Sequence, residues 1–222
     1  NNLLTLHRVT PQRLEEEREK WAASFGKLPR PRIAVIAGGN SGPFTLGPKA
    51  ASRLAHQAST LARQSGGSLL VSTSSRTSED AIAALRAGID VPNYFYQWQP
   101  SDPANPYFGI LATADRLVVT GDSIAMLSEA CATGRPVQIF DLGGMRGESE
   151  VATDFRVGAT AYAGLMRWCW QRLSRDITLV HSQLRATSRA FWLDEETGAS
   201  VVPGETDMER AVAAVKGLLG QP

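Results

Sequence analysis

The sequence is poor in cysteine and histidine and has no excess of either charge. Its two cysteines, Cys131 and Cys169, show no metal-ligand spacing, so we expect free, buried thiols in a reducing compartment. The 23 basic residues balance 22 acidic ones to a net charge of +1. This balance disfavours a surface that coats nucleic acid, although it leaves room for a local phosphate pocket. We therefore expect no nucleic-acid partner.

Long apolar runs are also missing. The chain has no run of 18 apolar residues and no signal-peptide pattern, so it should not span a membrane. We expect a cytoplasmic protein, whose contact with a membrane would be peripheral. The sequence opens with Asn1-Asn2-Leu3-Leu4 and has no initiator methionine, which suggests a fragment or a trimmed N-terminus.

The three histidines give no sign of a catalytic or metal site. His7, His56 and His181 have no paired carboxylate motif around them, and we interpret each as a surface or capping residue. No metal ligand and no catalytic residue is therefore assigned, and no cofactor is expected.

Short apolar runs alternate with helical patterns through the first two thirds of the chain. These runs are bounded by glycine, proline or polar residues and predict buried strands at 33–37, 69–71, 94–96, 117–119 and 137–140. The helices between them are predicted to begin at Pro48, Ser78, Pro106 and Ser123. This alternation predicts an α/β fold with a Rossmann-like parallel sheet and helices on both faces.

A separate helix precedes the first strand. Thr10 caps it, Pro11 takes its first position and Gly26 ends it. We divide the chain into an N-terminal helix with a linker, 1–28, and a Rossmann-like nucleotide-binding domain with a C-terminal helical extension, 29–222. The extension is expected to contain helices at 165–173 and 208–219 and an irregular segment at 189–200.

Two turns rich in glycine and hydroxyl groups follow predicted strands and lead into helices. The first turn, 38–47, contains four glycines, and the second, 120–130, reads TGDSIAMLSEA. With a strand order of 3-2-1-4-5, both turns lie where the strand order reverses, which is where such sheets bind ligands. The first turn matches neither G-x-G-x-x-G nor a P-loop, and this disfavours a dinucleotide dehydrogenase.

The side chains of these turns fit a nucleoside diphosphate. The helix that begins at Ser123 offers unpaired N–H groups to a phosphate, and Gly121 would let a ligand approach the backbone. Arg76, which follows the second strand, can pair with the same phosphate. Glu129 lies about 9 Å further along the helix axis, where its carboxylate can accept hydrogen bonds from a ribose. The first turn adds backbone amides and hydroxyls from Gly38, Gly39, Asn40 and Ser41.

Each of these assignments has a simpler alternative. Asp122 or Ser123 can merely cap the helix, and Glu129 and Arg76 can be solvated. Asp122 would also repel a diphosphate unless it points away from it. The first turn can be a flexible surface loop. Near the third strand, Trp98 and Tyr107 can hold a nucleobase or pack on the sheet edge.

Residues in the second turn resemble the donor-site helix of GT-B glycosyltransferases, including the N-acetylglucosaminyltransferase of peptidoglycan synthesis. The shared features are the turn into a helix, Glu129, and Gly134 followed by Pro136. A broader likeness, from Leu6 to about Phe140, is to the ELM-type mitochondrial-fission family, whose members are GT-B-like. It depends on five segments: His7-Arg8-Val9-Thr10-Pro11, Gly38-Gly39, Ser75-Arg76-Thr77, Asn105-Pro106-Tyr107 and Val119-Thr120-Gly121-Asp122-Ser123.

The resemblance implies a nucleotide-sugar-dependent glycosyltransferase of which this chain is the C-terminal, donor-binding half. A UDP-sugar or another nucleotide-sugar would be its substrate. The N-terminal half, which carries the acceptor site in GT-B enzymes, is not apparent in this sequence. The fission resemblance implies an alternative, a non-catalytic scaffold that binds protein partners through the helix at 10–26 and through Trp168 and Trp170.

Overall fold

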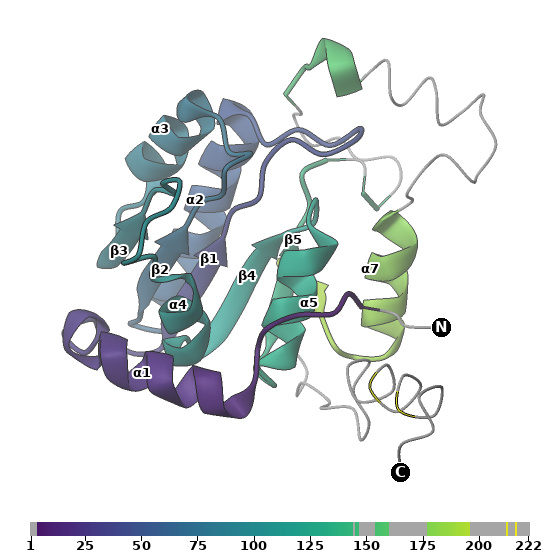
Figure 1. The fold of residues 1–222 in the computed structure, drawn as a ribbon. Coiled ribbons are helices and arrows are strands. Elements are labelled where there is room, and N and C mark those ends of the chain that lie inside the picture. Colours follow the sequence, from purple (N-terminus) through teal and green to yellow (C-terminus); the bar gives the residue numbers. More distant parts are fainter. Residues whose placement is uncertain are drawn as a thin grey trace.

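In the computed structural model, the described part of the chain comprises residues 4–143, 145–146, 154–159 and 177–195 with single positions 212 and 216, and it forms one parallel sheet. The strand order is β3-β2-β1-β4-β5-β6 (Figure 1). The strands are β1 (Arg32–Ile36), β2 (Ser68–Ser72), β3 (Asn93–Tyr96), β4 (Arg116–Thr120), β5 (Val137–Phe140) and β6 (Phe191–Trp192). The predicted order of the first five strands and the Rossmann-like class are confirmed.

Helices cover both faces of the sheet. They are α1 (Pro11–Phe25), α2 (Pro48–Gln64), α3 (Glu79–Gly88), α4 (Tyr107–Thr113), α5 (Ile124–Ala132) and α7 (Ile177–Ala186). Figure 1 shows α2 and α3 behind the sheet and α4 and α5 in front of it. Predicted caps are confirmed, since the hydroxyls of Thr10, Ser78 and Ser123 each accept a hydrogen bond from the first turn of their helix. None of the described helices is long and apolar enough to cross a membrane.

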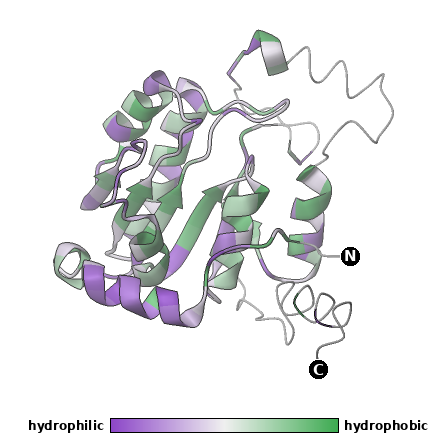
Figure 2. Ribbon diagram, viewed as in Figure 1, coloured by the Kyte–Doolittle hydropathy of each residue, from purple (hydrophilic) through white to green (hydrophobic). Residues whose placement is uncertain are grey.

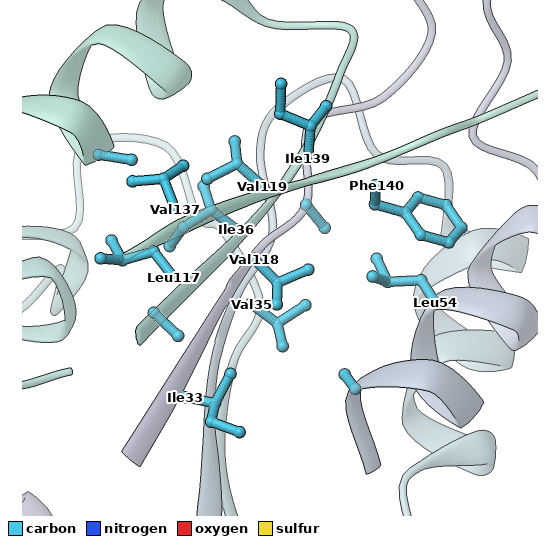
Figure 3. Packing of buried hydrophobic residues seen from close by; sticks show 14 of the residues in the cluster. Ile33, Val35, Ile36, Leu54, Leu117, Val118, Val119, Val137, Ile139 and Phe140 are labelled. Carbon is cyan, nitrogen blue, oxygen red and sulfur yellow. The ribbon is translucent and has the colours of Figure 1, made fainter. Parts of the chain in front are cut away.

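The core lies on both sides of the central strands. All five residues of β1 are buried, as continuous apolar runs in parallel sheets require. In Figure 3, Leu54 of α2 lies beside Phe140, and Val35 of β1 and its register partner Val118 of β4 project side by side from the sheet. Figure 2 shows the contrast between these strands and α1, whose ribbon is largely hydrophilic.

Helix α1 packs onto the same unit. Phe25 is fully buried, and its ring stacks on Trp21 at a centroid distance of 5.3 Å and meets Tyr94 edge-on at 5.0 Å. Trp21 in turn lies against Gly109 of α4, where a side chain would clash with the indole. The helix assigned to the 1–28 segment therefore shares the core of the sheet.

The C-terminal third differs from the prediction. Within the segment expected to be irregular, 189–200, Phe191–Trp192 forms the edge strand β6 and pairs with β5. A two-residue strand leaves no alternating pattern in the sequence, which is why it was missed. Helix α7 was also not predicted. The expected helices at 165–173 and 208–219, together with Trp168, Trp170 and Cys169, fall outside the described residues apart from 212 and 216.

Candidate functional site

Three loops meet at the carboxyl ends of β1, β2 and β4, and the Asp122 carboxylate joins them. This side chain is completely buried. Its Oδ1 accepts a hydrogen bond from the Thr120 hydroxyl at 2.6 Å, and its Oδ2 accepts one from the Gly39 N–H at 3.0 Å. The guanidinium of Arg76 lies 3.0 Å from Oδ2. Asp122 thus points away from the helix that follows it and into the junction of the loops.

Gly38 and Gly39 make this junction possible. A Cβ atom on Gly38 would collide with the Asp122 carboxylate, and one on Gly39 would collide with the backbone carbonyl of Arg76. The Gly38 N–H also donates to the Thr120 hydroxyl at 2.8 Å. The two glycines therefore allow the loops to approach one another, a role for which only a hydrogen in place of a side chain fits.

Close packing also explains why residue 121 is a glycine. Its missing Cβ would lie 2.6 Å from the Met145 sulfur and 3.2 Å from the His181 ring. His181, interpreted from the sequence as a surface or capping residue, is instead completely buried, and its Nε2 lies 2.8 Å from the Gly121 carbonyl. A carbonyl only accepts, so Nε2 carries the proton and donates. His181 lies on helix α7, which was not predicted, and a contact across 60 positions leaves no local pattern in the sequence.

Asn40 and Ser41 shape the loop between β1 and α2. The Asn40 side-chain oxygen accepts a hydrogen bond from the Leu46 N–H at 3.2 Å, while Ser41 and Phe44 exchange two backbone hydrogen bonds of 3.0 Å. The tight turn that results brings Ser41 to the wall of a hollow of about 330 Å³. Arg76, Ser123, Ile124 and Thr5 also line this hollow, which we call the small hollow.

Asp154 was not among the predicted residues. Its carboxylate accepts hydrogen bonds from the N–H groups of Lys49 and Ala50, at 3.1 and 2.9 Å, and so occupies the N-terminus of α2. Arg156 holds the same loop through the Gly42 carbonyl at 2.6 Å. An anion at a helix N-terminus is stabilised by the N–H groups there. In this conformation α5 rather than α2 offers its N-terminus to a ligand.

A larger cavity of about 600 Å³ adjoins the small hollow, and Arg76, Ser123 and Ala125 line both. We call it the large cavity. Glu129 lies in its wall, where its Oε2 accepts a hydrogen bond from the Tyr107 hydroxyl at 2.6 Å. Trp98, which is 37% exposed, forms part of the wall. Its backbone N–H donates to the Thr73 hydroxyl at 2.9 Å. Residues from α1, namely Arg13, Glu17 and Lys20, line it as well.

The structure therefore divides the eight predicted site residues into two groups. Ser41, Arg76, Ser123 and Glu129 line the small hollow, the large cavity or both. The remaining four line neither space and instead stabilise the packing and shape of the loops. They are Gly38, Gly39, Asn40 and Gly121. Tyr107, which sequence reasoning left between a base contact and packing, is in hydrogen-bond contact with Glu129.

Burial shifts the pKa of two side chains at the site, Asp122 and Tyr107. It raises the pKa of Asp122 above its usual range, although the three groups that donate to this carboxylate favour its ionised form. It raises the pKa of Tyr107 well above that of a free tyrosine, and the neighbouring Glu129 carboxylate adds to this rise. Tyr107 therefore stays protonated and remains a donor. Among the described residues, no group of histidine, cysteine or acidic side chains could hold a metal ion.

Comparison with known proteins identifies relatives of this chain. It is 30% identical over 134 residues to the mitochondrial fission protein ELM1 of Arabidopsis thaliana, a match that covers 60% of this chain and 31% of that protein. It is also 30% identical over 108 residues to an uncharacterized protein of Rickettsia prowazekii, covering 48% of this chain and 30% of the relative. The matches thus span less than a third of the length of these curated relatives.

Solved structures resemble the chain only distantly. Against the ADP-heptose heptosyltransferase II of E. coli, the TM-score is 0.38 at 15% identity, covering 60% of this chain and 38% of the enzyme. A UDP-GlcNAc 2-epimerase from Neisseria meningitidis gives a TM-score of 0.46 at 13% identity, covering 94% and 53%. The family model for mitochondrial fission ELM1, in contrast, matches residues 2–192. The chain belongs to the mitochondrial fission ELM1 family.

Proposed function

We propose that this chain is the donor-binding half of a nucleotide-sugar-dependent glycosyltransferase of the GT-B type. The observation that carries the proposal is the position of Glu129, whose carboxylate lies in the wall of the large cavity at the carboxyl edge of the sheet. This edge, beside the reversal of strand order between β1 and β4, is where doubly wound sheets bind ligands.

The two adjoining spaces suit the two ends of a nucleoside diphosphate. In our proposal the diphosphate occupies the small hollow, where Ser41, Arg76 and the start of α5 supply donors. Asp122 also lines that hollow, but its carboxylate is completely buried and is paired with the Arg76 guanidinium and the Gly39 N–H. In the proposal, this pairing weakens the repulsion between the carboxylate of the second turn and a phosphate.

The nucleoside would occupy the large cavity. We place the ribose against Glu129, and the base beside Trp98, which offers an exposed aromatic surface on the same wall. The polar groups of residues 72–76 also line the cavity and can bind base or ribose atoms. A UDP-sugar or another nucleotide-sugar would be the donor. The acceptor site would belong to an N-terminal half outside this chain.

The test is a thermal-shift panel of UDP, GDP, CDP, ADP and dTDP. A nucleotide at 100 times its Kd should stabilise the chain by about 2.7 kcal/mol. Glu129→Gln should weaken the binding of that nucleotide by about 1.5 to 3 kcal/mol, because a charged acceptor is lost. The matched control is Glu19→Gln, which changes an exposed glutamate of α1 outside both spaces.

The outcomes separate the proposal from its alternative. Stabilisation by one nucleotide, lost in Glu129→Gln and retained in Glu19→Gln, supports a donor site and identifies the base. If none of the five nucleotides shifts the melting temperature, the donor site is wrong for this chain. A scaffold that recruits protein partners, with which the family name is compatible, then becomes the better explanation.

A further inference from the structure

We propose that Tyr107 is a positioning residue for Glu129, holding one carboxylate oxygen so that the other is presented to the ribose diol of a bound nucleotide. The role rests on the proposed function, since it needs a ribose in the large cavity. It goes beyond that function by giving a task to the Asn105-Pro106-Tyr107 motif, to which the donor site assigns none.

The contact between the two side chains is close and spans two elements. Tyr107 is the first residue of α4, Glu129 lies in α5, and the hydroxyl is 2.6 Å from Oε2. Short distances of this kind are typical of hydrogen bonds to an ionised acceptor. Both residues line the large cavity. The bond therefore fixes a flexible glutamate at the wall of the space proposed for the nucleoside.

The residues before and after Tyr107 hold it in place. The Asn105 side-chain oxygen accepts a hydrogen bond from the Tyr107 N–H at 2.9 Å, and Pro106 leads into α4. The Phe108 ring meets the Tyr107 ring edge-on at 5.4 Å, and the guanidinium of Arg13 covers Phe108 at 3.6 Å. The motif thus orients the start of α4 so that the hydroxyl reaches α5.

The chemistry leaves one side of the carboxylate available. A carboxylate has two oxygens that accept hydrogen bonds, and Tyr107 occupies Oε2. Within the described ranges, Oε1 of Glu129 makes no hydrogen bond. Because burial and Glu129 itself keep the pKa of Tyr107 high, the hydroxyl stays protonated and continues to donate to Oε2. The ribose hydroxyls therefore have one preferred acceptor in a fixed direction.

The experiment measures the Kd of ADP, GDP and UDP and of their 2′-deoxy counterparts by calorimetry. For the ribonucleotide that binds, Tyr107→Phe should weaken binding about five- to tenfold, the size of one ordinary hydrogen bond. The 2′-deoxy counterpart, which lacks the hydroxyl in question, should change by less than about twofold. In a Glu129→Gln background, Tyr107→Phe should have no further effect, because the two residues act as one unit.

Tyr96→Phe is the matched control. Its hydroxyl also donates to a carboxylate, Asp102, at 2.8 Å, but both residues lie outside the lining of the large cavity. This variant should leave the preference for ribose over 2′-deoxyribose unchanged. It therefore shows what the loss of a tyrosine–carboxylate bond does to the fold alone.

Three results would overturn the positioning role. Equal losses for the ribonucleotide and its 2′-deoxy counterpart would mean that Tyr107 only supports the cavity wall. An unchanged Kd in Tyr107→Phe, with Glu129→Gln still defective, would remove Tyr107 and leave the donor site intact. A wild-type chain that binds none of these nucleotides would overturn both the role and the proposed function.

Discussion

Asp122 connects residues far apart in the sequence, and its surroundings explain why a carboxylate is tolerated there. Complete burial of a charge is costly unless its partners are supplied. Here a hydroxyl, a backbone N–H and the half-exposed Arg76 guanidinium supply them. In the proposed site, Arg76 would share its charge between Asp122 and a bound phosphate. Substitution of Arg76 would therefore disturb the loop junction as well as ligand binding.

Cys131 allows a prediction about a single thiol. Burial raises the pKa of Cys131 to about 11, and the sulfur lies 3.7 Å from the Arg189 carbonyl. Since only the thiolate reacts, a Cys169→Ser chain should react with DTNB at pH 8 more than about 100-fold slower when folded than when unfolded in urea. Between pH 8 and 10 the folded rate should rise about tenfold per pH unit, because the titration lies above that range.

The unfolded chain is the control for this measurement. Its rate should level off near the ordinary thiol pKa of about 8.5. A folded rate that levels off at the same pH would show that Cys131 is as accessible to ionisation as a free cysteine. The expectation of a free thiol is confirmed for Cys131, which is half-buried.

At the scale of elements, the packing of α1 decides whether the segment 1–28 folds together with the sheet or as a separate unit. Phe25→Ala should lower the free energy of unfolding by about 3 to 5 kcal/mol, because it opens a cavity where Phe25, Trp21 and Tyr94 now pack. Denaturant unfolding followed by fluorescence measures this change. The loss would mean that α1 unfolds with the sheet rather than as a separate unit.

Phe155→Ala is the matched control, because Phe155 is 82% exposed. It should change the free energy of unfolding by less than about 0.5 kcal/mol. If Phe25→Ala were equally mild, α1 would contribute little to the core and the boundary at residue 28 would also be a boundary of folding.

The elements that the sequence predicted well are those whose signals are local. Strands such as 137–140 are bounded by turn residues, and Gly134, just beyond the end of α5, has a φ of +69°, a conformation that favours glycine. What could not be predicted depends on contacts between distant residues. The Asp154 carboxylate reaches α2 across 105 positions, and His181 meets the second turn across 60. Neither pairing leaves a periodic pattern in the sequence.

In the candidate site, too, features with a local signal could be predicted, and those that depend on contacts between distant residues could not. The positions of Ser41 and Ser123 in the two turns could be predicted because a strand, a tight turn and a helix start are readable locally. The structural roles of Gly38 and Gly39 could not, because they depend on which loop lies opposite. The pairing of Tyr107 with Glu129 likewise needed the packing of α4 beside α5.

At the scale of the whole molecule, the strand order sets how stability is distributed. β1 and β4 lie at the centre of the sheet and are hydrogen-bonded on both sides, whereas β3 and the two-residue β6 form its edges. Hydrogen exchange of the unliganded chain should therefore be slowest in peptides covering 33–36 and 117–120. Peptides covering β6 should exchange faster, because an edge strand opens without disrupting the centre.

The same measurement with bound nucleotide tests where the ligand lies. At short exchange times, the nucleotide that gives the largest thermal shift should slow exchange in peptides covering 73–76, 105–107 and 123–129, which contain residues lining the two proposed subsites. Peptides around Arg116 and Gln138 serve as the internal control, because they line a different hollow formed with α2. Stabilisation of the whole fold slows only the amides that exchange by global unfolding, and these are seen at long times. Early protection around Arg116 and Gln138 instead of at the three site segments would move the nucleotide away from Glu129.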